Sequence, residues 1–330
     1  MNLTTINKTE LLNPEIEFEY FVDFAKNFVK KIEAGEILTK KKVRFSKDTI
    51  RQYNVSITHF EEFEKNIGTQ IKCIQMNKKV FSAFEIYLQN GDLLYNSIYL
   101  YISKIKALAN ILYDEEIIPR AISLQTPKKE TTQVYLNVDE LSAMKNCDTL
   151  TESERIVFDI FTIQSFSGLR FATLKVFLSN PAAHIQQNGS KTYISIVSKK
   201  TQSESIIPLS RIIFDILKKY DYKIKVPTEE YFNRVIKKIG EKAGITNPIP
   251  TQVTKNGETE TILIPKYKKL STHTSRRSFV TLAKMYISDT NAIMAMTSHA
   301  TEKQLNSYCR SSNLERVNNI FDNQFFNLTI

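Results

Sequence analysis

Four consecutive segments in the first third of the chain carry apolar residues at helical spacing, and this pattern constrains the fold more than any other feature. Their apolar side chains recur every three or four positions and so share one face of a helix. Ser46 is predicted to cap the second helix. The four predicted helices are Glu17–Ile32, Lys47–Asn66, Lys78–Gln89 and Leu94–Tyr113. Because short connections join them, their apolar and aromatic faces are expected to form the core of a compact bundle.

The composition agrees with a mainly helical protein that has two hydrophobic cores. Of the 330 residues, 42% are hydrophobic, and eight Gly and nine Pro are too few for a β-sandwich rich in turns. The length suits two ordinary domains. Residues 118–132 have the composition of a linker, with two prolines and a lysine pair, so we place the boundary near Lys129. The predicted domains are therefore residues 1–128 and 129–330.

Beyond the linker, one segment has its apolar residues at every second position instead of at helical spacing. Between Tyr193 and Leu209, alternating residues flank a Lys-Lys-Thr-Gln-Ser segment, which predicts a β-hairpin. A second, short hairpin is expected around Asn256-Gly257. The predicted helices of this half are Val138–Lys145, Glu152–Gln164, Phe171–Leu178, Ser210–Tyr220, Glu229–Ala243, Thr274–Ile287, Asn291–Met296, Glu302–Cys309 and Leu314–Phe321. The predicted fold class is mainly α with a small antiparallel β-sheet, an amino-terminal helical bundle followed by an α+β domain.

The charge balance favours a polyanionic partner. The formal net charge is +10, and a basic excess of this size fits nucleic acid, where binding releases counterions. A basic run between the first two predicted helices is interpreted either as a solvated segment or as a loop that contacts phosphates. Its cations are Lys40, Lys41, Lys42, Arg44 and Lys47.

The three cysteines indicate neither a disulfide framework nor a zinc site. Cys73, Cys147 and Cys309 are widely spaced and form no Cys-x-x-Cys motif, which is typical of a reducing cytoplasm. The amino terminus lacks the apolar segment of a signal peptide, and no apolar run approaches the length of a membrane span. We therefore expect a cytoplasmic protein without a membrane partner.

A group of reactive residue types lies near the carboxy terminus. His273 and Arg276 form a His-x-x-Arg motif, and Tyr308 follows His299 by nine positions. Guanidinium groups match phosphate oxygens, and an assisted tyrosine hydroxyl can attack a phosphodiester. These residues predict an enzyme that binds a phosphodiester and attacks it with a tyrosine.

At this point the carboxy-terminal half resembles the catalytic domain of the tyrosine recombinases, the phage-integrase family. Residues 167–170, Ser-Gly-Leu-Arg, resemble the family's Thr-Gly-Leu-Arg box. The predicted hairpin, SKKTQSESIIPLS, resembles the hairpin with the catalytic lysine, and the His-x-x-Arg motif and the His299-to-Tyr308 spacing match in the family's order. The resemblance spans about Tyr135 to Tyr308. The amino-terminal half looks like the family's core-DNA-binding domain, a SAM-like bundle.

The resemblance implies phosphoryl transfer without a metal, ATP or any other cofactor. Tyr308 would attack the phosphorus and form a 3′-phosphotyrosyl bond while a 5′-hydroxyl leaves. Arg170 and Arg276 would clamp the non-bridging oxygens, where charge grows in the transition state. His273 would take the tyrosine proton or hold a phosphate oxygen, and His299 would donate a further hydrogen bond.

The resemblance also implies a lysine that acts as general acid to the leaving oxygen. Successive strand side chains point to opposite faces, so only one of Lys199 and Lys200 can enter the site. Lys200, which precedes Thr201, matches the family pattern better; Lys199 remains the alternative and is otherwise a candidate DNA contact. Arg277 lies about 100° around the helix from Arg276. It is interpreted as a structural residue or a DNA-backbone contact.

Two positions depart from the family pattern, and two histidines match none of its motifs. Thr173 replaces the acid commonly found three residues after the first arginine, which affects the support of the site rather than its reaction class. Ser298 replaces the usual glycine before the second histidine. His59 and His184 are interpreted as ordinary residues.

The function implied by the resemblance is site-specific recombination of double-stranded DNA, for integration, excision or inversion of a segment, as on bacterial mobile elements. The family pattern implies a homo-tetramer on paired sites, in some systems with accessory DNA-bending proteins. The apolar tail Phe321–Ile330 would dock on a neighbouring protomer or on its own domain. The alternatives are a type IB topoisomerase-like enzyme and a recombinase-derived DNA-binding protein that no longer cuts.

Overall fold

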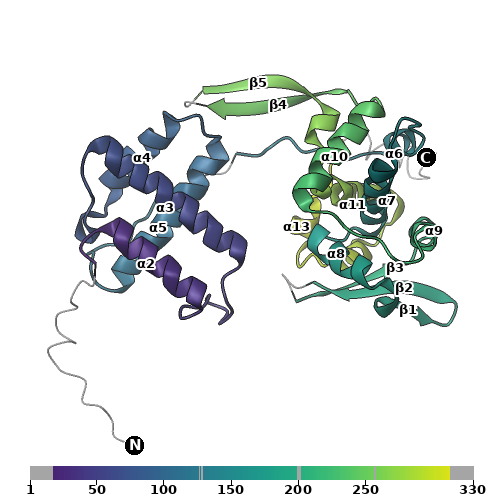
Figure 1. The fold of residues 1–330 in the computed structure, drawn as a ribbon, viewed down its shortest axis with the longest axis horizontal. Helices are drawn as coiled ribbons and strands as arrows, with labels where there is room; N and C mark the ends of the chain where they lie inside the picture. The colour runs from purple at the N-terminus through teal and green to yellow at the C-terminus, as the bar shows by residue number, and fades with distance from the viewer. Residues whose placement is uncertain (1–17, 126, 128, 199–201, 256–257, 313–330) are drawn as a thin grey trace, which may run out of the picture. The chain divides into compact units, whose positions relative to one another are not determined.

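The computed structural model describes residues 18–312 apart from residues 126, 128, 199–201 and 256–257, and it divides into two compact units (Figure 1). The first unit contains the chain up to Thr131 together with Gln252–Thr261, and the second contains Thr132–Thr251 and the chain from Ile262 onward. The predicted helix Leu314–Phe321 and the tail Phe321–Ile330 lie outside the described residues.

The first unit is a helical bundle, as the apolar periodicity predicted. Its α-helices are α2 (Phe21–Ala34), α3 (Lys47–Ile67), α4 (Lys78–Gln89) and α5 (Tyr95–Asp114), with a short 3₁₀ helix, η1 (Cys73–Gln75). Helix α3 packs against the other three α-helices (Figure 1). Ser46 caps α3 as predicted, because its side chain accepts a hydrogen bond from the backbone N–H of Thr49 at 3.2 Å.

Aromatic side chains form the core of this bundle. The ring of Phe60 is fully buried and makes edge-on contacts with Phe21 and Phe84, with ring centroids 5.1 Å and 5.0 Å apart. Such pairs add to the free energy of burial. The aromatic stripes are therefore core residues, as predicted, and not an exposed surface for stacking bases.

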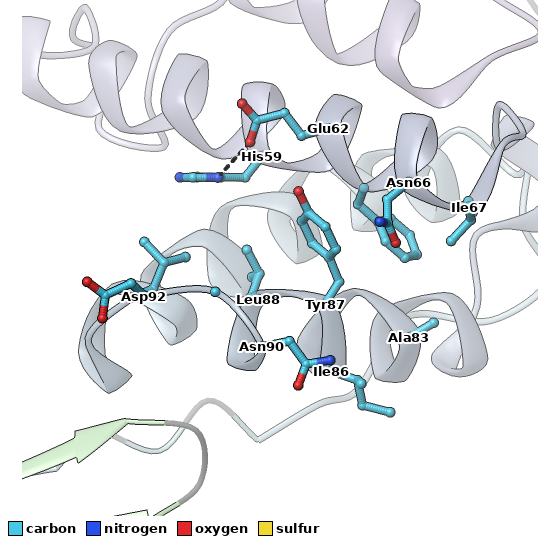
Figure 2. Close-up of a pocket in the computed structure, with 13 residues that line it drawn as sticks. His59, Glu62, Asn66, Ile67, Ala83, Ile86, Tyr87, Leu88, Asn90 and Asp92 are labelled. Carbon is cyan, nitrogen blue, oxygen red and sulfur yellow. Dashed lines mark hydrogen bonds and ion pairs between the residues drawn. The ribbon is translucent and has the colours of Figure 1, made fainter.

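A cavity of about 700 Å³ lies between α3 and α4 (Figure 2). His59 and Glu62 on α3 line it and share a hydrogen bond of 3.2 Å, while Tyr87 points toward it from α4. The His59 ring also packs on Tyr101, with ring centroids 4.5 Å apart. His59 is thus part of the packing of the first unit.

The second unit is built around a central helix, α7 (Glu152–Ser167). It packs against α9 (Arg211–Lys219), α10 (Glu229–Lys242) and α11 (Thr272–Tyr286). Fully buried Ile160, Phe161 and Ile163 of α7 occupy the middle of its core. Its other α-helices are α6 (Val138–Lys145), α8 (Phe171–Ser179), α9 (Arg211–Lys219), α10 (Glu229–Lys242), α11 (Thr272–Tyr286), α12 (Thr290–Thr297) and α13 (Glu302–Asn306), with 3₁₀ helices η2 (Pro181–Ala183) and η3 (Lys266–Lys269).

The predicted hairpin forms two strands of a three-stranded antiparallel sheet in the order β1–β2–β3. Strands β2 (Lys191–Val197) and β3 (Glu204–Pro208) pair with Ile196 opposite Ser205. The added strand β1 (Ile185–Asn188) was not predicted, because its Ile-Gln-Gln-Asn sequence shows no apolar alternation. The inward residues Ile194, Ile196 and Ile207 join the core of the second unit.

The hairpin expected around Asn256-Gly257 is present but much longer than predicted. Its strands are β4 (Pro248–Lys255) and β5 (Glu258–Pro265), and β5 is mostly exposed. In the first unit, the Lys129 ammonium donates to Thr254 Oγ1 at 2.8 Å and to Thr259 Oγ1 at 2.9 Å. The length of a strand is predicted from the run of alternating apolar residues that faces a core. An exposed strand such as β5 has no such run, so the predicted hairpin was too short.

Candidate active site

The side chain of Arg276 is the centre of the site. It extends from α11, is 2% exposed, and donates hydrogen bonds to the carbonyl oxygens of Gly168 and Thr297 and to Nε2 of His299. The Thr297 bond is 2.6 Å long and the His299 bond 3.0 Å. A buried guanidinium needs such partners because burial removes its water. The turn at Gly168 and the segment Thr297–His299 are therefore both tied to the one cation that α11 carries.

Gly168 explains why the Ser-Gly-Leu-Arg segment has glycine at its second position. It ends α7 with φ of +66°, in the left-handed region that favours glycine. A Cβ there would lie 2.8 Å from Cε1 of Phe279 and closer still to Cδ1. Its carbonyl oxygen meanwhile accepts from Arg276 Nη1. The turn thus carries Arg170 into the site and also binds the second arginine.

Gly168→Ala is expected to lower the free energy of unfolding by about 2–5 kcal/mol. The left-handed backbone costs about 1–2 kcal/mol for alanine, and the clash with Phe279 adds about 1–3 kcal/mol. Gly189→Ala is the matched control, since Gly189 has φ of +58° but no atom within 4 Å of its Cβ position. Urea denaturation of both variants measures the difference; equal losses would contradict the steric argument.

Arg170 places a second guanidinium beside the first. It is the half-buried N-cap residue of α8, and its guanidinium makes no hydrogen bond or ion pair with the described residues. Burial, and then the charge of Arg170, lower the pKa of Arg276 to about 10. Arg276 therefore stays charged at neutral pH. Two neighbouring guanidinium groups repel each other, and an anion bound between them would relieve the repulsion.

The hydrogen bonds of His299 define its tautomer. Thr297 Oγ1 donates to the carbonyl of Ile293 at 2.7 Å, so it accepts from Nδ1 of His299 at 2.8 Å. Nε2 then carries the lone pair that accepts from Arg276. Burial, Arg276 and Arg170 together lower the pKa of His299 to about 3. The ring is neutral at pH 7, and a protonated Nε2 would face a cation.

The lowered pKa of His299 predicts a loss of stability in mild acid. Between pH 6.5 and pH 3 the unfolded chain binds a proton at this residue and the native protein does not. Stability therefore falls with decreasing pH in that window, with a slope approaching about 1.4 kcal/mol per pH unit. His299→Gln should flatten the slope measured by urea denaturation, with His184→Gln as the control for loss of an imidazole elsewhere. An unchanged slope in His299→Gln would contradict the assignment.

Tyr308 lies against both groups. Its ring centroid is 4.9 Å from that of His299 and 5.3 Å from the Arg276 guanidinium carbon. The predicted helix Glu302–Cys309 was wrong at its end: α13 stops at Asn306 and Tyr308 occupies a turn. Its backbone N–H donates to Leu305 at 2.9 Å. The turn frees the ring from the helix surface and directs it to Arg276.

Arg310, which sequence reasoning missed, fastens this turn. Its Nη2 donates to the carbonyl of Ser307 at 2.5 Å, and its backbone N–H donates to Thr281 Oγ1 of α11 at 2.9 Å. Arg310 and Tyr308 also surround half-buried Arg277: burial, and then Arg310, lower the pKa of Arg277 to about 10. No family motif marks Arg310, so only its position two residues after Tyr308 could have drawn attention to it.

A cavity of about 650 Å³ joins several of these groups. It is bounded by the end of the β2–β3 turn, by α12, and by the segment around α13. Its lining includes Arg170, Glu204, Ser298, His299 and Tyr308. The cavity is large enough for a phosphodiester and its neighbouring sugars, and Arg170 brings a cation to its wall.

The other residues predicted for the site have varied places. His273 is exposed in the first turn of α11, and its pKa is lowered by partial burial and by Arg277. Lys199 and Lys200 lie outside the described residues. Thr173 is buried on α8 and supplies no carboxylate. His184 lies beside Phe177 at the edge of the sheet, with ring centroids 6.4 Å apart, and is not among the residues that line the cavity with Arg170.

The serine that replaces glycine before His299 adopts the conformation for which glycine is favoured. Ser298 has φ of 52° and ψ of 41° and ends α12. Its hydroxyl hydrogen-bonds to Ser205 and lies 3.4 Å from the carbonyl oxygen of Glu204. The departure therefore leaves the backbone of the turn intact and adds a side-chain contact to β3.

In the first unit, the cations of the basic run are all exposed. A tight turn contains Lys40, Lys41 and Lys42. A groove of about 570 Å³ is lined by Arg44, Lys47, Arg51 and Glu33. Among the described residues, none of the five predicted cations has a side-chain hydrogen bond or ion pair with another residue. They are available to an anionic partner.

Neither a membrane span nor a metal cluster is found in the described part of the chain. No helix there is both long and apolar enough to cross a bilayer. Within the same residues, no three His, Cys, Asp or Glu side chains come together in a group that could hold a metal ion.

The fold and the site define a class, and comparisons with known proteins agree with it. The model of the phage integrase SAM-like domain matches residues 20–128. Residues 20–128 belong to this domain family, and the chain as a whole has the fold of the tyrosine recombinases, with a SAM-like domain followed by an integrase-like catalytic fold. The resemblance drawn from the sequence is confirmed at this level. Among curated protein sequences, none matches the chain.

Three solved structures illustrate the similarity. XerH recombinase bound to a palindromic difH substrate, in a post-cleavage complex, has a TM-score of 0.64 at 14% identity over 93% of this chain and 98% of that one. A lambda integrase tetramer bound to a Holliday junction has a TM-score of 0.64 at 14% identity, covering 94% and 84%. The Tn1549 transposon integrase with circular intermediate DNA has a TM-score of 0.60 at 11% identity, covering 94% and 100%.

Proposed function

We propose that this protein is a site-specific DNA recombinase that cleaves and rejoins duplex DNA through a 3′-phosphotyrosine intermediate. The observation that carries the proposal is the grouping of Tyr308 with Arg276, His299 and Arg170 beside one cavity. A nucleophile next to two guanidinium groups suits a phosphodiester, whose charge increases in the transition state. The similar proteins that were solved with DNA support the same reading.

The chemistry follows from the charges of the site. A tyrosine hydroxyl ordinarily has a pKa near 10 and needs help at neutral pH. The Arg276 guanidinium lies over the ring of Tyr308, so a cation stands beside the proposed nucleophile. His299, with its pKa near 3, is a weak proton acceptor. Exposed His273 is the better acceptor for the phenolic proton, and Lys200 or Lys199 would protonate the leaving 5′-oxygen.

Covalent capture tests this function. The probe is a pool of duplexes with randomised sequence and a nick placed so that the cleaved fragment diffuses away and rejoining fails. With EDTA present, we expect a protein–DNA adduct that survives denaturation and enriches particular sequences. No adduct from the whole pool would contradict the proposal and favour a DNA-binding protein that does not cut.

A second assay separates recombination from topoisomerase chemistry. A plasmid with two copies of the captured sequence should yield inverted or deleted products, and the protein should cross-link as a tetramer on paired sites. Relaxation of a plasmid with one copy, without recombinants from the plasmid with two, would favour a type IB topoisomerase-like enzyme. We propose that the protein acts on DNA in the cytoplasm. Accessory DNA-bending proteins can be added to the same assay to test whether they are required.

The basic run is proposed as a DNA-backbone contact of the first unit. Arg44, Lys47 and Arg51 share one groove, and each phosphate contact releases a counterion. Replacing Arg44 and Lys47 by glutamine should reduce the slope of log K against log salt by about 2. The matched control replaces Lys78 and Lys79, two exposed lysines of α4, by glutamine. Fluorescence anisotropy on captured DNA measures both; equal slopes in the two double variants would contradict the contact.

A further inference from the structure

Two side chains on one face of α11 hold the short segment that carries Tyr308. Thr281 Oγ1 accepts from the backbone N–H of Arg310 at 2.9 Å, and the Lys284 ammonium donates to the side-chain oxygen of Asn306. Residues three positions apart lie on the same face of a helix. Asn306 precedes Tyr308 and Arg310 follows it. Both ends of the segment are therefore tied to the same helix.

The backbone of this segment leaves its local hydrogen-bond pattern at Arg310. The backbone N–H groups of Ser307, Tyr308 and Cys309 donate to carbonyl oxygens of residues shortly before them in the chain. The N–H of Arg310 donates instead to the Thr281 hydroxyl of α11. A contact with another helix therefore fixes the course of the chain directly after Tyr308.

The two contacts with α11 differ in their exposure to water. The Thr281 side chain is fully buried, whereas the hydrogen bond between Lys284 and Asn306 is exposed. Water competes with an exposed hydrogen bond, so such a bond contributes little, while a bond to a buried acceptor is costly to lose. Thr281 is therefore the stronger of the two attachments.

The helix that holds the segment also carries Arg276, the cation at the centre of the site. Arg276 and Thr281 are separated by about 7.5 Å along the axis of α11, given the rise of an α-helix. The Arg276 guanidinium carbon lies 5.3 Å from the ring centroid of Tyr308. The proposed phosphate-binding group and the attachment of the proposed nucleophile thus belong to one rigid element.

We infer that Thr281 is a positioning residue that holds Tyr308 where it can attack a phosphorus bound by Arg276. This inference rests on the proposed function. In cleavage, the bond from Tyr308 Oη to phosphorus forms and the bond from phosphorus to the 5′-oxygen breaks. The phenolic proton passes to a base, and the 5′-oxygen takes the electron pair and a proton.

The rate of such a step depends steeply on where the nucleophile lies. The reacting atoms must approach to about 3–3.5 Å, and a displacement of about 1 Å can lower the rate about 10²-fold. Thr281 binds the backbone of Arg310, so it acts through the turn and not on the reacting atoms.

Two substitutions separate the hydroxyl of Thr281 from its packing. Valine keeps the shape of threonine but removes the oxygen, whereas serine keeps the oxygen and loses the methyl group. On the captured duplex with its nick, Thr281→Val should slow single-turnover cleavage about 10-fold at saturating protein, because the turn loses its attachment. Thr281→Ser should cleave within about twofold of wild type, and the dissociation constant from anisotropy should change by less than about twofold in both variants.

Temperature and a matched control separate positioning from overall stability. All rates are measured well below the melting temperature of each variant, where the folded fraction is complete. Thr162→Val is the control, since the Thr162 hydroxyl donates to the carbonyl of Phe158 within its own helix, α7, at 2.9 Å. This variant should cleave at the wild-type rate.

The outcomes are distinct from those of the proposed function. If the wild-type protein forms no adduct, the proposed function is wrong, and the inference falls with it. If the wild-type protein forms the adduct but Thr281→Val cleaves at the wild-type rate, the positioning role alone is wrong. The same conclusion follows if Thr281→Ser is as slow as Thr281→Val.

Hydrogen exchange on the wild-type protein without DNA tests the contact itself and requires no variant to fold. The Arg310 amide should exchange at least about 10-fold more slowly than an unprotected amide in the same sequence. Exchange at the unprotected rate would show that Thr281 does not hold the turn and would overturn the inference.

Discussion

Replacing Tyr308 by phenylalanine is expected to lower adduct formation on the nicked substrate by at least about 10⁴-fold, because the phenolic oxygen is the proposed nucleophile. The ring contacts with His299 and Arg276 need no hydroxyl, so the fold and DNA affinity should stay close to wild type. Denaturing gel electrophoresis measures the adduct, and anisotropy measures binding.

The control for Tyr308→Phe is the same change at Tyr286, which lies at the end of α11 with 79% of its surface exposed. It should form adduct at the wild-type rate. An adduct that persists in Tyr308→Phe would mean that another residue attacks the phosphorus, and mass spectrometry of the DNA-linked peptide would identify it.

The second large effect is expected at Arg276. Arg276→Lys keeps the charge but offers one nitrogen where the guanidinium contacts Gly168, Thr297 and His299. Loss of the phosphate clamp should lower the cleavage rate about 10³-fold. Buried acceptors left without donors cost about 1–3 kcal/mol each, so the free energy of unfolding should fall by about 2–4 kcal/mol.

Temperature separates the two effects of Arg276→Lys. Single-turnover cleavage is measured well below the melting temperature of the variant, where the folded fraction is complete. Arg234→Lys, on the exposed side of α10, is the matched control for the same change of side chain. A variant that is destabilised yet cleaves within about tenfold of wild type would show Arg276 to be a structural residue only.

Much of the fold could be predicted because its signals are local. The apolar stripes of α3, α4 and α5 and the cap at Ser46 depend on spacing along one segment. The β2–β3 hairpin is marked by alternation on either side of a polar turn. By contrast, β1 and β5 are mostly exposed, and the buried residues of β4, Thr251 and Thr254, are polar. Their pairing depends on the partner strand, which no local pattern records.

The site could be predicted in part for a similar reason. The order of the sequence motifs made it possible to predict Arg170, Arg276, His299 and Tyr308 as site residues. Their order does not reveal that the Gly168 carbonyl binds Arg276 or that Arg310 fastens the turn of Tyr308. The predicted helix around Tyr308 was wrong for the same reason: the turn is held by contacts with α11 rather than by local propensity.

The sequence by itself determined which segments are helical, where the chemistry-bearing residues stand, and the class of reaction they suit. These depend on spacing and side-chain type, both of which are properties of the linear chain. Only the tertiary structure decided the tautomer and lowered pKa of His299, the partners of Arg276, and the pairing of Ser298 with Ser205. Burial and hydrogen-bond geometry depend on residues brought together from distant segments, and their energies exist only when the chain is folded.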